Sequence, residues 1–255
     1  MTSGFANLAG LRAVVTGASS GIGRAIAREL AVGGADVVIH CCRSVDDARA
    51  LATEIRGMGR RSEVIAADLR DHAGLQHFVD DACDQLGGID VWVNNAGADL
   101  LTSDDASLGY HEKLNQLLDV DVAGTILLSR LVGQKMTSAG QGVILNIGWD
   151  QADRGMAGDS GELFAAAKNA IMGFSRSLSV SLAPKVRVNC IAPGWIRTAW
   201  GEQASDVWQE RVHRETPLQR WGTPQDIAAV ARFLSSPDAA YITGQVIAVN
   251  GGAVR

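Results

Sequence analysis

A glycine-rich turn near the start of the chain has the residue types and spacing of a phosphate-binding site. It lies between an apolar run at residues 11–15 and an amphipathic run at residues 24–30, and it reads Thr16-Gly17-Ala18-Ser19-Ser20-Gly21-Ile22-Gly23. Glycine lets a backbone turn tightly and approach a ligand without a Cβ atom between them. A helix that begins there directs unpaired N–H groups toward an anion. The pattern predicts strand, turn and helix with a bound pyrophosphate, and the alternative is a purely structural turn.

A cation and a hydroxyl follow the next apolar run, about twenty residues beyond the turn. Residues 35–41 are apolar and β-branched, and the segment ends in His40-Cys41-Cys42-Arg43-Ser44. An acidic residue at this place would bind a ribose diol, whereas Arg43 and Ser44 suit a 2′-phosphate. We therefore expect NADP rather than NAD, with Arg24 as a second candidate cation. The alternative is that Arg43 is an ordinary solvated arginine.

Composition narrows the class of protein. The chain has 255 residues, a formal net charge of -5 and 47% hydrophobic residues. An acidic protein is poorly suited to bind nucleic acid or an anionic membrane. Because there is neither an apolar run of about 18 residues nor a signal-peptide pattern, we expect a soluble, cytoplasmic protein. The four cysteines lack metal-ligand spacing, so we expect small buried apolar residues and no metal site.

Apolar runs alternate with amphipathic segments along the whole chain. Strands are predicted at residues 11–15, 35–41, 64–67, 89–93, 143–147, 186–191 and 246–249, and helices at 24–30, 45–58, 75–86, 110–137, 161–182, 206–214 and 224–234. Strands that are apolar throughout require cover on both faces of a parallel sheet. We predict one α/β domain over residues 1–255, a doubly wound Rossmann-type sheet of about seven strands, with its ligand at the carboxyl ends of the strands.

Further motifs follow the later predicted strands. They are Asp68-Leu69, Asn94-Asn95-Ala96-Gly97, Pro193-Gly194-Trp195-Ile196-Arg197-Thr198, Thr243-Gly244-Gln245 and Asn250-Gly251-Gly252. Together with the glycine turn, they make nearly the whole chain resemble the short-chain dehydrogenase/reductase family. The resemblance implies an NADP(H)-dependent oxidoreductase with a small-molecule substrate, a substrate lid at residues 199–220 and a homotetramer. It also implies cofactor contacts: Asp68 and Leu69 at the adenine, Asn95, Ala96 and Gly97 along the cofactor, and Pro193, Gly194, Ile196 and Thr198 past the nicotinamide.

The catalytic positions depart from that family's pattern. The family signature is Tyr, three residues and then Lys, with a partner Ser and a helix Asn, but this chain has Phe164 before Lys168. Trp149 or Asp150 stands at the Ser position, and Asp121 at the Asn position. Phenylalanine has no proton to give. Lys168 alone is retained, and the resemblance implies that it binds the nicotinamide ribose.

Two functions fit this altered site. The first is a reductase with a non-standard proton path, because hydride chemistry belongs to the cofactor and an iminium carbon accepts hydride without a proton. Asp150 would pair with a cationic C=N group or deliver a proton, as the similarity to pteridine reductases suggests, and Trp149 and Trp195 would face a flat ligand. Glu162, Asp153 and Asp159 add acidity near Asp150, and the alternative is that these acids are ordinary solvated residues. The second function is a non-catalytic NADP-binding sensor, scaffold or partner subunit.

Overall fold

A single parallel β-sheet forms the centre of the molecule. The computed structural model describes residues 4–98, 100 and 104–254, so the ends of the predicted domain, residues 1–3 and 255, lie outside the described part. The strands are β1 (Arg12–Val15), β2 (Asp36–Cys41), β3 (Ser62–Ala66), β4 (Val91–Asn94), β5 (Gly142–Ile147), β6 (Val186–Pro193) and β7 (Val246–Val249). Their order is β3-β2-β1-β4-β5-β6-β7, and every pairing is parallel. This confirms the predicted seven-stranded, doubly wound α/β fold.

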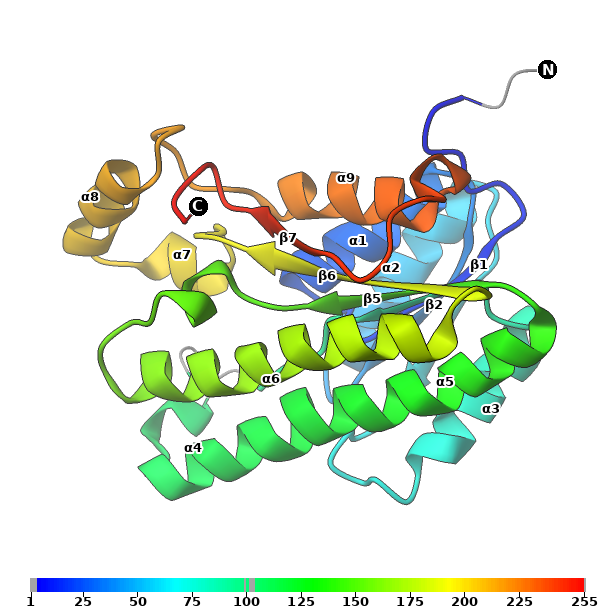
Figure 1. Ribbon diagram of the computed structural model, residues 1–255, viewed down its shortest axis with the longest axis horizontal. Coiled ribbons are helices and arrows are strands. Elements are labelled where there is room, and N and C mark those ends of the chain that lie inside the picture. The colour runs from blue at the N-terminus through cyan, green and yellow to red at the C-terminus, as the bar shows by residue number, and fades with distance from the viewer. Residues whose placement is uncertain (1–3, 99, 101–103, 255) are drawn as a thin grey trace.

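Helices cover both faces of the sheet, as apolar strands require (Figure 1). The helices α1 (Gly21–Val32), α2 (Val45–Gly57) and α9 (Pro224–Ser235) enclose one core. On the other face lie α3 (Leu75–Leu86), α5 (Thr125–Ala139) and α6 (Asp159–Leu182) around a second core. The chain reverses its direction of winding between β1 and β4, which are neighbours in the sheet. Ligands of doubly wound sheets bind at this reversal point, beyond the carboxyl ends of the strands.

The long helix predicted over residues 110–137 is not a uniform α-helix. It consists of α4 (Tyr110–Gln116), a π-helical segment (Leu117–Gly124) and α5. A π-helix adds a residue to each turn and is found mainly at functional sites. Periodicity missed it because the segment continues the apolar pattern of the helices on either side without a break. Its consequence is local: Asp121 lies in this segment and is 1% exposed.

Two short helices, α7 (Ala199–Gln203) and α8 (Asp206–Glu215), lie beyond the carboxyl ends of β6 and β7 (Figure 1). Trp195 and Trp208 pack with ring centroids 5.3 Å apart, and the Arg211 guanidinium lies 4.6 Å from the Trp208 centroid. Trp195 and Trp221 are buried in the same apolar cluster. The Trp195 ring therefore packs α8 against the chain that follows β6. Trp195 also lines a smaller cavity of about 190 Å³, so its contact with a flat ligand stays a prediction. No helix in the described part of the chain is long and apolar enough to cross a membrane.

Candidate functional site

The glycine turn between β1 and α1 is held in a shape that only glycine permits. Gly17 has φ +61°, and a Cβ atom there would lie 2.7 Å from the Ala96 Cα atom. The Asn95 side-chain amide donates to the carbonyl oxygens of Thr16, at 3.0 Å, and Gly17, at 3.1 Å. Ser20, the residue before α1, makes no side-chain cap, and the first turn of α1 has no acidic residue. The positive end of the helix therefore faces the cavity without a side-chain anion, as a pyrophosphate site needs.

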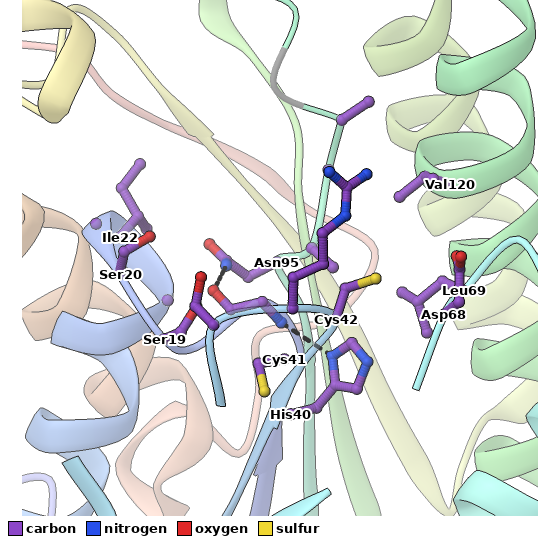
Figure 2. A pocket seen from close by; sticks show the side chains of 18 of the residues that line it. Ser19, Ser20, Ile22, His40, Cys41, Cys42, Asp68, Leu69, Asn95 and Val120 are labelled. Carbon is purple, nitrogen blue, oxygen red and sulfur yellow. Dashed lines mark hydrogen bonds between the residues drawn. The ribbon is translucent and has the colours of Figure 1, made fainter. Parts of the chain in front are cut away.

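His40, at the end of β2, supports the same turn and was missed from the sequence. Its Nδ1 accepts a hydrogen bond from the Gly17 N–H at 3.1 Å, so the ring proton is on Nε2, which lies 3.0 Å from the Ala67 carbonyl oxygen. Figure 2 shows His40 and Asn95 directed at the turn. Burial lowers the pKa of His40 to about 4, so the ring is neutral near pH 7. The imidazole thus connects the glycine turn to the ends of β2 and β3.

A cavity of about 580 Å³ opens at the carboxyl ends of the strands, where the winding reverses. Most of the predicted cofactor residues line it: Gly17, Ser19, Ser20, Gly21, Ile22, Gly23, Arg43, Ser44, Asp68, Leu69, Asn95, Ala96, Gly97 and Thr198. Residues that the sequence reasoning did not assign to this site also line it: His40, Cys41, Cys42, Arg70, Ala98, Gln116 and Val120, and so does Ala199 from the predicted lid. Cys42 is exposed, not buried as predicted, because β2 ends one residue earlier. His40 and Arg70 could have been found from the sequence, because both lie near the carboxyl ends of predicted strands. Such ends meet at one edge of a parallel sheet.

Several predicted cofactor residues do not line this cavity. Lys168, Pro193 and Gly194 are absent from its wall, and Ile196 lines a smaller cavity of about 190 Å³ whose wall includes Val249 and Asn250. Gly194 packs closely against Asn250, where a Cβ atom would lie 2.6 Å from the Asn250 Cβ atom. The backbone directly after β6 therefore packs against the C-terminal residues of the chain.

The cations at the cavity rim are Arg43 and Arg70, not Arg24. Arg43 and Ser44 are exposed and line the cavity. Arg24 turns to α2, where its Nη2 lies 3.4 Å from Glu54 and its Nη1 donates to the Asp47 carbonyl oxygen. Glu54 also binds Arg28 at 2.6 Å. The acidic face of α2 thus draws Arg24 away from the place where a second cation was predicted.

Two aromatic rings occupy the position where the family's hydroxyl groups are expected. The Trp149 and Phe164 centroids are 6.4 Å apart at an interplanar angle of 66°, an edge-to-face contact. Phe164 lines the main cavity. The structure therefore brings the two predicted positions together, but with apolar surface where a proton donor would stand. Neither tyrosine replaces it: Tyr110 donates to Glu162 at 3.3 Å, and Tyr241 is fully exposed.

Lys168, one helical turn after Phe164, forms a buried ion pair with Asp121. The ammonium Nζ lies 2.9 Å from Asp121 Oδ2, and the two side chains are 13% and 1% exposed. Asp121 Oδ1 accepts the Ala98 N–H at 2.8 Å, and Lys168 also reaches the Ile147 carbonyl oxygen at 3.4 Å. The pair connects the π-helical segment to α6 and to the end of β5. Lys168 is thus retained together with an anion that compensates its charge.

Asp150 is directed away from the main cavity. Its Oδ2 accepts from the Asn250 amide at 3.0 Å, while its Oδ1 is buried without a hydrogen-bond partner. Burial raises its pKa to about 6, and the hydrogen bond from Asn250 opposes this shift. Asp150 does not line the cavity, and its contact with substrate stays a prediction. The neighbouring acids Asp153 and Glu162 are exposed, which agrees with the alternative that they are ordinary solvated residues.

The raised pKa of Asp150 makes stability depend on pH. A carboxyl whose pKa is higher in the folded state stabilises the fold at low pH, and this contribution is lost as pH rises from about 4 through about 6. We expect Asp150→Asn to unfold at higher urea at pH 7, with a gain of roughly 2 kcal/mol, and to match the parent protein at pH 4. Asp153→Asn, a change in an exposed neighbour, is the control. A gain that is equal at both pH values would contradict the assignment.

A doubly wound sheet with an anion-binding turn at its reversal point and a cavity beyond its strand ends defines a dinucleotide-binding protein. The comparisons with known proteins agree. Residues 17–254 match the family model described as enoyl-(acyl carrier protein) reductase. The 3-oxoacyl-[acyl-carrier-protein] reductase FabG of Vibrio cholerae is 35% identical over 248 residues, which cover 96% of this chain and 98% of that protein. The chain belongs to the short-chain dehydrogenase/reductase family.

Solved structures that are similar to this chain include proteins with a bound nicotinamide cofactor. A short-chain dehydrogenase of Burkholderia cenocepacia in complex with NADP is 34% identical with a TM-score of 0.87, covering 97% of this chain and 99% of that one. A 7α-hydroxysteroid dehydrogenase complexed with NADH and 7-oxo glycochenodeoxycholic acid is 32% identical with a TM-score of 0.90, covering 100% and 98%. The family is therefore one of nicotinamide-dependent oxidoreductases, and its members differ in their choice between the two cofactors.

Proposed function

We propose that this protein is an NADPH-dependent reductase that transfers hydride to a C=N or pterin-like substrate rather than to a simple ketone. The observation that supports it most is the combination of Phe164 in the cavity wall with a retained Lys168. The cavity keeps what the cofactor needs, whereas the position of the hydroxyl acid is apolar. A site of this kind suits a substrate that needs no proton from residue 164.

The residues present fit NADP(H). The turn at residues 17–23 would hold the pyrophosphate, Arg43 and Ser44 the 2′-phosphate, and Asp68 and Leu69 the adenine. Gly97, Ala98, Phe164 and Thr198 also line the cavity and would enclose the nicotinamide end. When bound, NADPH supplies the hydride. The chain's own part is to orient both reactants and to stabilise charge.

The charge of the substrate decides which residues are needed. A ketone that accepts hydride becomes an alkoxide and requires a nearby acid, whereas an iminium carbon becomes a neutral amine. For a substrate that does require a proton, Asp150 is our candidate donor, since burial brings its pKa to about 6. That role requires its carboxyl to leave the Asn250 amide and turn to the cavity. A rate that falls as pH rises above about 6, and is lost in Asp150→Asn, would support this donor.

A second function is favoured by the aromatic contact itself. Trp149 and Phe164 close the place of both expected hydroxyl groups, which suits an inactive NADP-binding homologue acting as a sensor, scaffold or partner subunit. We also propose a homotetramer in the cytoplasm and a lid at residues 199–220 that closes over substrate. Light scattering tests the assembly, and a monomer at micromolar concentration would contradict it.

The two functions are separated by two measurements. Tryptophan fluorescence during titration with NADPH and NADH tests cofactor binding, and loss of NADPH absorbance with a panel of ketones, cyclic imines and dihydropterins tests turnover. Binding with turnover of an imine or pterin supports the reductase. Binding without turnover of any compound supports the inactive homologue, and failure to bind either cofactor contradicts both.

Phe164→Tyr adds one hydroxyl to a ring that already lines the cavity. We expect the stability of this variant to lie within about 1 kcal/mol of the parent, because Phe164 is half-buried and lines an open cavity. We also expect ketone reduction to appear at a rate at least about tenfold above background, since a positioned acid contributes that much or more. The assay is NADPH consumption with the ketone panel, with Phe174→Tyr as a control outside the cavity. No gain in ketone reduction would show that more than the hydroxyl is missing.

A further inference from the structure

Arg70 lines the main cavity, beside Asp68 at the end of β3, and no motif assigned it a role. Its Nε lies 3.0 Å from both carboxylate oxygens of Asp68, and its Nη2 lies 2.5 Å from Oδ2. The Arg70 backbone N–H donates to Asp68 Oδ1 at 3.0 Å as well. One arginine therefore engages both oxygens of the carboxylate through its side chain and its backbone.

This contact fixes the charge of Asp68. The side-chain hydrogen bond from Arg70 lowers the pKa of Asp68, burial raises it by less, and the charge of Arg43 lowers it further. Asp68 is thus ionised and lies within the electrostatic range of Arg43, on the neighbouring end of β2. In Figure 2, Asp68 and Leu69 lie on one side of the cavity, and Ser19 and Ser20 of the glycine turn lie on the other.

An ionised carboxylate at this place is a problem for a phosphorylated ribose. A 2′-phosphate held by Arg43 and Ser44 would meet Asp68 as a like charge, which disfavours NADPH relative to NADH. Arg70 removes this penalty, because the three charged groups Arg43, Asp68 and Arg70 together are positive. The Arg70 and Asp68 side chains are 41% and 37% exposed, so solvent screens the effect to a moderate size.

We propose that Arg70 is a specificity-determining residue, which compensates Asp68 and adds a cation at the 2′-phosphate of NADP(H). The inference rests on the proposed function, since it requires that the cavity binds NADPH. On this proposal, residues after two neighbouring strands set the preference for NADPH. Arg43 follows β2, and the Asp68–Arg70 pair follows β3. Asp68 is thereby left with an arginine as its partner in the free protein.

The test is the ratio of the dissociation constants for NADH and NADPH, measured by fluorescence titration at low and high salt. Arg70→Ala should weaken NADPH about tenfold and NADH less than about twofold, and Arg70→Lys should keep most of the preference. Asp68→Asn combined with Arg70→Ala should restore most of the ratio, because the uncompensated carboxylate is gone. NADH and NADPH carry the same adenine, so a change in the adenine contacts cancels in the ratio of the two dissociation constants. The preference of the parent protein should decrease at high salt.

The control is Arg49→Ala, since Arg49 is an exposed arginine of α2 that pairs with Asp46 at 3.5 Å and does not line the cavity. Equal weakening of both cofactors by Arg70→Ala would show a structural role and overturn the inference. So would an unchanged ratio in a protein that binds NADPH, and this outcome leaves the proposed function standing. If the parent protein binds neither cofactor, the inference and the proposed function fall together.

Discussion

Replacing Lys168 by methionine is expected to destabilise the protein by about 3 kcal/mol, because it leaves Asp121 as a buried charge without its partner. Asp121 is 1% exposed, and among the described residues the Ala98 N–H would remain to compensate its carboxylate. Urea unfolding measures the loss. A methionine side chain has nearly the length of the lysine stem, so the change tests charge more than volume.

The double variant Asp121→Asn with Lys168→Met provides the decisive comparison. Both charges of this pair are removed, and we expect its stability to return to within about 1 kcal/mol of the parent. Surface pairs of this length contribute little, so Lys135→Met, which breaks the exposed pair with Asp80, should cost less than about 1 kcal/mol. If the double variant were as unstable as Lys168→Met, packing of the lysine stem and not charge would explain the loss.

The sequence predicted the fold well because its signals are local. Apolar runs and glycine punctuation located all seven strands of the sheet, and Gly87, with φ +74°, ends α3 where the helix was predicted to stop. The glycine turn is a further case, since positive φ and close contacts make glycine necessary. The π-helical segment around Asp121 was missed because a single added residue per turn hardly changes an apolar pattern.

Side-chain directions at the site were harder to predict, since they depend on partners distant in sequence. Arg24 turns to Glu54, and Asp150 to Asn250, a residue 100 positions away. The pairing of Lys168 with Asp121 likewise needs α6 and the π-helical segment side by side. The sequence shows which residues replace the family's catalytic ones. It does not show that the charges of Lys168 and Asp121 compensate each other. A lysine neutralised by an aspartate, together with two aromatic rings at the hydroxyl positions, is what distinguishes this site.

Gly23→Ala is expected to have the largest effect on the cofactor site. A Cβ atom at this first turn of α1 would collide with the Gly17 carbonyl oxygen and the Asn95 amide nitrogen, which are hydrogen-bonded to each other. The backbone or the amide must move, so the turn that faces the pyrophosphate opens. We expect a loss of about 3 kcal/mol in stability and weakening of NADPH binding by at least about a hundredfold.

The matched control for this variant is Gly57→Ala at the end of the neighbouring helix α2. A Cβ atom at Gly57 meets nothing within 4 Å, so the same chemical change should leave NADPH binding intact. Asn95→Ala combined with Gly23→Ala removes one of the two colliding groups and should recover part of the stability but not the binding, because Asn95 also fixes the carbonyl of Thr16. Full NADPH binding by Gly23→Ala would mean that the turn shifts freely, and the pyrophosphate would then have to be held elsewhere in the cavity.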